Sequence, residues 1–314
     1  MSLPHLKSSL ERPFLSEPGM ETTLYYKHQI ALPSFSSLPL LTNPTHRALI
    51  SSLYANYISI AAAHNTGIIL DTRTWRASTP WASALNMTPA ELLAANRDAV
   101  QLAKAARTHS RATSTNVPVL ISGTMGPLQD AYEDSSQAIS LDTARDAYRP
   151  QVQTLADAGV DLLGLFTISN LNEAIAIIEL AREVGLPIVV SFSIGTDGRL
   201  LGGNSLEDAI RAVDEATGGY AAYFGVNCAH PARIAAALRE MSSEVRARIG
   251  MVRGNASQKT HDELDNTDTL DRGHIPTYLD GFRDALALLP AVKVVGGCCG
   301  TDEEHLGAIG GGLL

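Results

Sequence analysis

The stretch Val294-Val295-Gly296-Gly297-Cys298-Cys299-Gly300-Thr301, near the C-terminus, carries the pattern that decides the fold. The valines predict the end of a buried strand, the glycines allow a sharp turn, and two adjacent thiols stand where a helix is expected to follow. A second stretch, Tyr223-Phe224-Gly225-Val226-Asn227-Cys228, has a similar pattern. It ends on Cys228, the third of the 3 cysteines in the chain. The pattern predicts parallel strands that are each followed by a helix and that carry thiols at their ends.

Eight strand and helix pairs follow one another along the chain. The strands are near-continuous apolar runs, which is typical of a parallel sheet covered by helices. In chain order the pairs are 13–20 with 45–65, 67–74 with 88–108, 117–126 with 140–159, 161–167 with 170–185, 187–194 with 205–218, 220–228 with 231–248, 249–255 with 275–289, and 293–299 with a short helix from 301. This order predicts an α/β protein, a single (β/α)8 TIM barrel over 13–314 after a loosely ordered lead-in over 1–12. A doubly wound open sheet is the alternative. The polar loop 256–274 is long enough to act as a lid.

The composition argues against nucleic-acid-binding, membrane-spanning and secreted proteins. The chain has 314 residues, of which 45% are hydrophobic and 18% charged, and a formal net charge of −9. This charge, without a cluster of Lys and Arg, argues against nucleic acid as a partner. No apolar run reaches membrane length, and the N-terminus lacks the order of a secretory signal. We therefore expect a cytoplasmic monomer or small homo-oligomer that acts on small molecules.

The three cysteines are the candidate catalytic and metal-ligating residues. In a TIM barrel the active site lies at the C-terminal ends of the strands, so Cys228, Cys298 and Cys299 are expected to converge. Three thiolates suit Zn²⁺ with one position left open, where a bound thiol loses its proton and becomes a nucleophile. Two alternatives remain: three inert buried cysteines, or a structural zinc site closed by His230 or His305.

Both cysteine motifs resemble those of the zinc-dependent homocysteine S-methyltransferases, a family that includes S-methylmethionine-dependent and betaine-dependent enzymes. The likeness rests on Gly-Val-Asn-Cys at 225–228 and Gly-Gly-Cys-Cys-Gly-Thr at 296–301, with support from 17–22, 72–78 and Gly126-Pro127. It implies a barrel whose cysteines hold zinc and activate a small thiol, most simply homocysteine, which takes a methyl group from a sulfonium or ammonium donor to give methionine. It also implies a set of substrate-binding residues: Glu17, Met20, Thr74, Trp75, Phe166, Asn227 and Asn255.

The chain departs from the family pattern at three strand ends, and the first departure is Glu17 in place of the more usual Asp. Phe166-Thr167 stands where the family has Glu-Thr, whose glutamate holds the amino group of homocysteine, and 253–256 keeps only the asparagine of a Tyr-Pro-Asn-Ser-like segment. These changes predict an altered acceptor pocket. Either another carboxylate takes over the ammonium group, or the thiol has none; the candidate carboxylates are Glu17, Asp71 and Asp130.

Other roles stay open at the sequence level. Trp75 and Trp81 offer aromatic faces to an onium donor, and Arg73 and Arg76 offer guanidinium groups to a carboxylate. Two further hypotheses compete with thiol methylation: another alkyl transfer or a demethylation on a different thiol, and a non-catalytic zinc-binding barrel.

Overall fold

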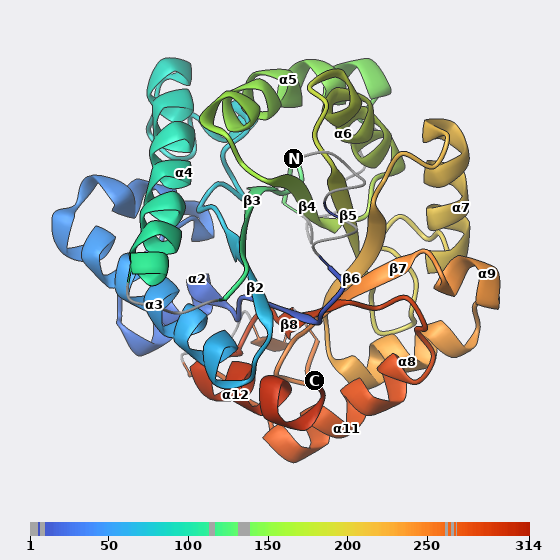
Figure 1. Cartoon of the computed structure of the whole chain (residues 1–314). Coiled ribbons are helices and arrows are strands. Elements are labelled where there is room, and N and C mark those ends of the chain that lie inside the picture. Colours follow the sequence, from blue (N-terminus) through green and yellow to red (C-terminus); the bar gives the residue numbers. More distant parts are fainter. Residues whose placement is uncertain are drawn as a thin grey trace.

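The protein is a closed barrel of eight parallel strands. The computed structural model describes residues 6, 10–112, 117–130, 139–260, 263–264, 267 and 269–314. Each strand pairs with the next in chain order, and β8 pairs back with β1. Figure 1 looks along the barrel and shows the strands as an inner ring surrounded by helices. The predicted (β/α)8 TIM barrel is therefore confirmed, and the doubly wound open sheet is excluded.

The elements alternate as the sequence predicts. The strands are β1 (Phe14–Ser16), β2 (Gly67–Asp71), β3 (Val119–Met125), β4 (Leu162–Ile168), β5 (Ile188–Ser193), β6 (Tyr223–Ala229), β7 (Ile249–Gly254) and β8 (Val294–Gly297). The helices are α2 (Met20–Thr22), α3 (Pro44–Ala63), α4 (Pro89–Ala112), α5 (Leu141–Ala158), α6 (Leu171–Glu183), α7 (Leu206–Thr217), α8 (Pro231–Arg239), α9 (Ser243–Arg246), α11 (Ile275–Leu286) and α12 (Glu303–Gly312). Among the helices that the structure describes, none has both the length and the apolar character needed to cross a membrane.

Local chemistry explains where the elements differ from prediction. The first strand ends at Ser16 rather than at residue 20, because Met20–Thr22 is already helical. The helix expected over 231–248 is two helices, α8 and α9. Ser242 caps α9 by accepting a hydrogen bond from the backbone N–H of Val245, which starts a new helix at this point. The predicted lid over 256–274 lies partly outside the described residues.

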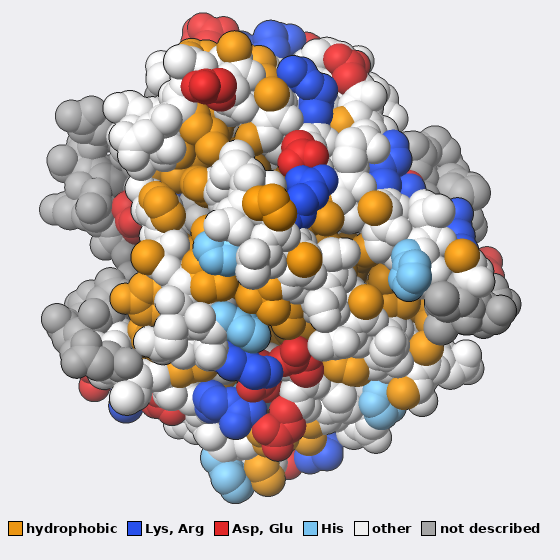
Figure 2. Space-filling model, turned by 90° about the vertical axis from the view of Figure 1, so that its left-hand side faces the viewer, with side chains coloured by type: hydrophobic (Ala, Val, Ile, Leu, Met, Phe, Trp, Pro, Cys, Tyr) orange, Lys and Arg blue, Asp and Glu red, His pale blue; other side chains and the backbone are white. Residues whose placement is uncertain are grey.

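Pairs of opposite charge link neighbouring helices on the outer surface of the ring. Figure 2 shows one side of the molecule, where charged side chains of both signs lie among apolar and neutral ones. On the same side of the ring, Arg47 of α3 forms an ion pair with Asp98 of α4. Such exposed pairs tie neighbouring helices together but contribute little to stability, about 0–1 kcal/mol each.

Two apolar clusters fill the molecule. The larger one lies between the strands and the helices, and the smaller one fills the interior of the barrel. The interior cluster contains side chains from β1 to β8, and also Leu6 and Leu10, which are 0% and 6% exposed. These two leucines of the segment predicted as a lead-in are thus packed against barrel residues. The remaining residues of 1–9 lie outside the described part, so the boundary at residue 12 stays a prediction.

The buried position of Leu6 leads to a stability prediction. Replacing Leu6 by Ala removes apolar contacts inside the barrel and should lower the free energy of unfolding by about 3 kcal/mol. The matched control is Leu201→Ala, because Leu201 is 53% exposed and should lose little. Urea unfolding followed by circular dichroism measures both changes, and equal effects of the two substitutions would contradict the packing described here.

Candidate functional site

Three sulfur atoms meet at the C-terminal end of the barrel. Cys228 is the second-last residue of β6, and Cys298 and Cys299 follow β8 directly. Their Sγ atoms all lie within 4.8 Å of one another, and those of Cys228 and Cys298 are 2.9 Å apart. The predicted convergence of the three thiols is therefore found in the structure.

The backbone around the cysteine pair is tied to its neighbours. The N–H of Cys298 donates to the carbonyl of Gly254 at 2.8 Å, and the carbonyl of Cys299 accepts from Ala256 at 3.0 Å. Gly300 has a φ of 81°, in the left-handed region that favours glycine. The glycine after the thiols therefore permits the turn that presents both side chains toward β6.

Cys228 is held in an unusual backbone conformation. Its φ is 58°, and Thr167 at the end of β4 has a φ of 65°. The side chain of Asn227 bonds both to the backbone N–H of Thr167, at 3.1 Å, and to its hydroxyl oxygen, at 2.9 Å. The Thr167 hydroxyl lies 3.7 Å from Cys228 Sγ. Non-glycine residues in this region are costly and occur at functional sites, where surrounding contacts fix them. Asn227 thus positions a thiol.

The thiols resist ionisation in the absence of a cation. The hydrogen bond with Cys228, together with burial, raises the pKa of Cys298 to about 12. Hydrogen bonds with Cys228 and Cys298, followed by burial, raise the pKa of Cys299 as well. Ionisation of all three thiols in this volume would require a positive partner, and the cluster is a group that could hold a metal ion.

Neither nearby histidine closes this site. His305 uses both ring nitrogens, with Nδ1 bonded to Asp302 at 2.8 Å and Nε2 to the carbonyl of Arg272 at 3.0 Å. His230 Nδ1 caps α8 by accepting from the backbone N–H of Ala232. Within the described part of the chain, the three cysteines alone form a group of this kind. The structural zinc site closed by His230 or His305 is not formed.

A buried network of four charged side chains lies beside the sulfur atoms. Glu17 accepts from Arg73 at 2.5 Å and from the backbone N–H of Asp71 at 2.6 Å. Asp71 in turn accepts from Arg253 at 2.6 Å and from the Thr124 hydroxyl at 3.0 Å. Burial raises the pKa of Glu17 to about 8, although the charge of Arg73 acts in the opposite direction. Each of the two acidic side chains has an arginine partner, which offsets part of the cost of burying its charged form.

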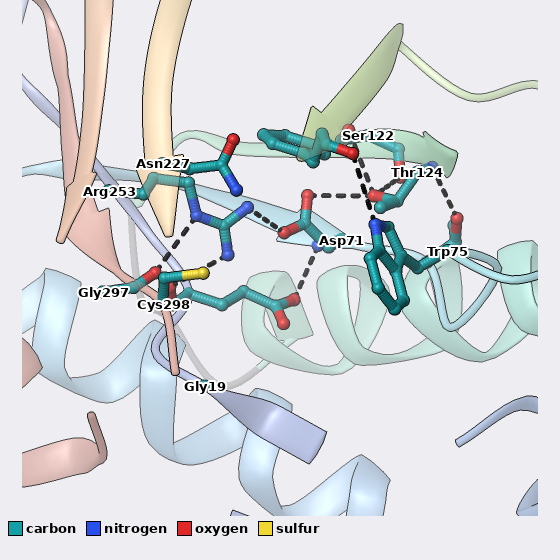
Figure 3. Close-up of polar contacts among 12 residues, drawn as sticks. Gly19, Asp71, Trp75, Ser122, Thr124, Asn227, Arg253, Gly297 and Cys298 are labelled. Carbon is teal, nitrogen blue, oxygen red and sulfur yellow. Dashed lines mark hydrogen bonds and ion pairs between the residues drawn. The ribbon is translucent and has the colours of Figure 1, made fainter. Parts of the chain in front are cut away.

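Arg253 connects this network to the cysteines. It extends from β7, and Figure 3 shows its guanidinium group between Asp71 and Cys298. Its Nε donates to the carbonyl of Gly297 at 3.1 Å, and Nη2 donates to the carbonyl of Glu17 at 3.2 Å. Its guanidinium carbon also lies 4.8 Å from the ring centre of Phe166. Sequence analysis gave Arg253 no role, although a lone charge within the apolar run of β7 was a usable signal.

The aromatic residues of the predicted site have partners in the protein. Trp75 Nε1 donates to the carbonyl of Phe166 at 3.4 Å. Arg76 lies 4.8 Å from the ring of Trp75 and 4.3 Å from that of Trp81, and its guanidinium group bonds to Asp130. The faces considered for an onium donor are thus covered on one side by an arginine of the chain itself.

The other predicted substrate-binding residues differ in accessibility. Met20 and Thr74 are buried, and the Thr74 hydroxyl bonds to the carbonyl of Thr124 at 2.6 Å. Thr74 thus links the segment after β2 to β3, and the substrate-binding role of Met20 and Thr74 stays a prediction. Asn255 is half-buried, and its Oδ1 is enclosed without a hydrogen-bond partner in the described structure. It is the predicted residue that retains an unused buried acceptor.

Comparison with known proteins agrees with this geometry. A family model described as homocysteine S-methyltransferase matches residues 15–311. Homocysteine S-methyltransferase 1 of Arabidopsis thaliana is 26% identical over 299 residues, covering 88% of this chain and 86% of the relative. Selenocysteine Se-methyltransferase of Brassica oleracea var. italica is 28% identical over 205 residues, covering 61% of this chain and 57% of the relative.

Solved structures share the fold. The homocysteine methyltransferase MmuM from Escherichia coli in its oxidized form superposes with a TM-score of 0.75 at 22% identity, covering 98% of both chains. Its metallated form gives a TM-score of 0.72 at 22% identity, covering 98% of this chain and 99% of that one. Because the family model spans nearly the whole barrel, the chain belongs to the homocysteine S-methyltransferase family and is a methyltransferase.

Proposed function

We propose that this enzyme is a zinc-dependent S-methyltransferase that moves a methyl group from a sulfonium or quaternary ammonium donor to a small thiol. Homocysteine, the acceptor in the names of its relatives, is the first candidate. The observation that carries the proposal is the group of three Sγ atoms within 4.8 Å of one another at the mouth of the barrel.

The donor set fits zinc. Cysteine sulfur is a preferred zinc ligand, and three protein ligands leave one tetrahedral position for a substrate. A substrate thiol in this position would have its pKa lowered by zinc, which is the chemistry that the metal supplies. Three cysteines without a disulfide also suit a reducing compartment, and the cytoplasm is the location we propose.

The residues around the sulfur atoms account for the rest of the reaction. Asn227 and Thr167 fix Cys228, and the Arg253 guanidinium offsets part of the negative charge that accumulates beside Cys298. The acceptor thiol gives its proton to solvent, and its sulfur forms a bond to the methyl carbon. The bond from that carbon to the positive sulfur or nitrogen of the donor breaks, and the donor leaves as a neutral sulfide or amine.

Metal content tests the proposal. The purified protein should contain about one zinc per chain, and replacing any of the three cysteines by Ser should abolish both tight zinc binding and methyl transfer. The control is His230→Asn, because asparagine can still cap α8 and His230 is not a ligand in this geometry. Elemental analysis after dialysis gives the stoichiometry. Zinc retained by the cysteine variants, or lost from His230→Asn, would contradict the ligand set.

A second prediction concerns the contacts by which Asn227 and Thr167 position Cys228. In Asn227→Ala, Thr167 loses both side-chain bonds from residue 227, so zinc affinity should fall about tenfold or more, as for other residues that orient metal ligands. Asn172→Ala is the control, because the Asn172 side chain donates an exposed hydrogen bond to the carbonyl of Ile139 rather than to Thr167. Competition with a chromogenic chelator measures both affinities. An unchanged zinc affinity in Asn227→Ala would contradict the proposal that Asn227 positions Cys228.

A further inference from the structure

Arg253 is a fixed cation at the mouth of the barrel, beside the cysteines. Three different strands or strand ends hold it, through the carboxylate of Asp71 and the backbone carbonyls of Glu17 and Gly297. Arg253 is 8% exposed, so most of the residue is enclosed by protein. Its orientation is therefore set before any substrate arrives.

The guanidinium group of Arg253 has more N–H donors than it has acceptors in the described structure. Each of its three nitrogens has one acceptor in the described structure, whereas Nη1 and Nη2 each carry two N–H groups. One N–H on each terminal nitrogen is thus left for a further acceptor. Two parallel donors of a guanidinium group match the geometry of a carboxylate.

The same guanidinium group changes what Phe166 can bind. It lies 4.8 Å from the centre of the Phe166 ring, in cation–π contact. By the family resemblance, residue 166 is where a glutamate holds the ammonium group of homocysteine. Here an aromatic ring occupies that position, and a cation of the protein itself already covers the ring. A substrate ammonium group at this place would meet a like charge.

The two buried carboxylates of the network do not replace the missing glutamate. Glu17 is paired with Arg73, and Asp71 is paired with Arg253. Phe166 itself lines a cavity of about 10 Å³ inside the barrel, together with Ile69, Leu162, Val189 and other interior residues. This cavity is too small for an acceptor thiol, so we expect the polar end of the acceptor to lie at the level of Arg253.

We infer that this enzyme recognises its acceptor through an anionic group bound by Arg253 and not through an ammonium group, so that small mercaptocarboxylates without an amino group belong to its acceptors. The inference rests on the proposed function, because it concerns the same thiol at the same zinc site. Homocysteine carries a carboxylate as well, and is accepted by virtue of that group.

Three thiols of the same length separate the two modes of recognition. 4-Mercaptobutyrate is homocysteine without its amino group, and 3-aminopropane-1-thiol is homocysteine without its carboxylate. Calorimetric titration of the zinc-loaded protein, without a methyl donor, gives a dissociation constant for each thiol. Repetition in buffers of different ionisation enthalpy gives the number of protons released.

The expected order follows from the charge at Arg253. 4-Mercaptobutyrate should bind at least as tightly as homocysteine, and about tenfold or more tighter than the aminothiol, the effect of one charge-assisted hydrogen bond. Homocysteine binding about tenfold tighter than 4-mercaptobutyrate, or equal binding of all three thiols, would overturn the inference. If no thiol binds with release of a proton, the proposed function fails instead.

A pair of variants assigns the preference to Arg253. Arg253→Met leaves Asp71 as a buried unpaired charge, so the test uses the double variant Arg253→Met with Asp71→Asn, and Asp71→Asn alone is its matched control. The double variant should lose about tenfold in affinity for 4-mercaptobutyrate and little for the aminothiol. A merely structural role would weaken all three thiols equally. Phe166→Glu offers an independent check, because it should favour homocysteine over 4-mercaptobutyrate.

Discussion

The constraint on which the site depends is the confinement of three thiols to one small volume, where their thiolate forms would repel one another. Sulfur atoms this close stay protonated unless a cation is shared among them. Closure of the barrel brings them together, because β7 pairs with β6 on one side and with β8 on the other. The surrounding residues then restrain atoms that would otherwise move apart. Asn227 and Thr167 restrain Cys228, and the bonds to Gly254 and Ala256 restrain the cysteine pair.

The buried charged side chains beside the cysteines connect the strand ends around the site. Glu17, Asp71, Arg73 and Arg253 alternate in sign, so each is compensated without water. Removing one member would leave a partner uncompensated, at a cost of about 3–5 kcal/mol. Burying such a network costs desolvation free energy. Its location at the strand ends suits a role in setting charge and shape at the mouth of the barrel, and not in stability alone.

The sequence predicts the barrel and the three cysteines because both leave strong local signals. Continuous apolar runs mark the eight strands, and glycines with adjacent thiols mark the strand ends. The orientation of other side chains is less predictable. The alternation of a regular strand does not apply where the backbone turns left-handed, as at Thr167 and Cys228. The burial of Met20 and Thr74 and the bonds of Arg253 depend on contacts between distant segments, which spacing along the chain does not encode.

The position of Arg76 between two indole rings has a spectroscopic consequence. The chain contains 2 tryptophans, Trp75 and Trp81, and both have this guanidinium group over their rings. The indole groups of Trp75 and Trp81 also donate to the backbone carbonyls of Phe166 and Pro127. All of the intrinsic tryptophan emission therefore arises from one corner of the barrel rim. The natural fluorescence of the molecule is a local optical reporter of that corner, without any attached dye.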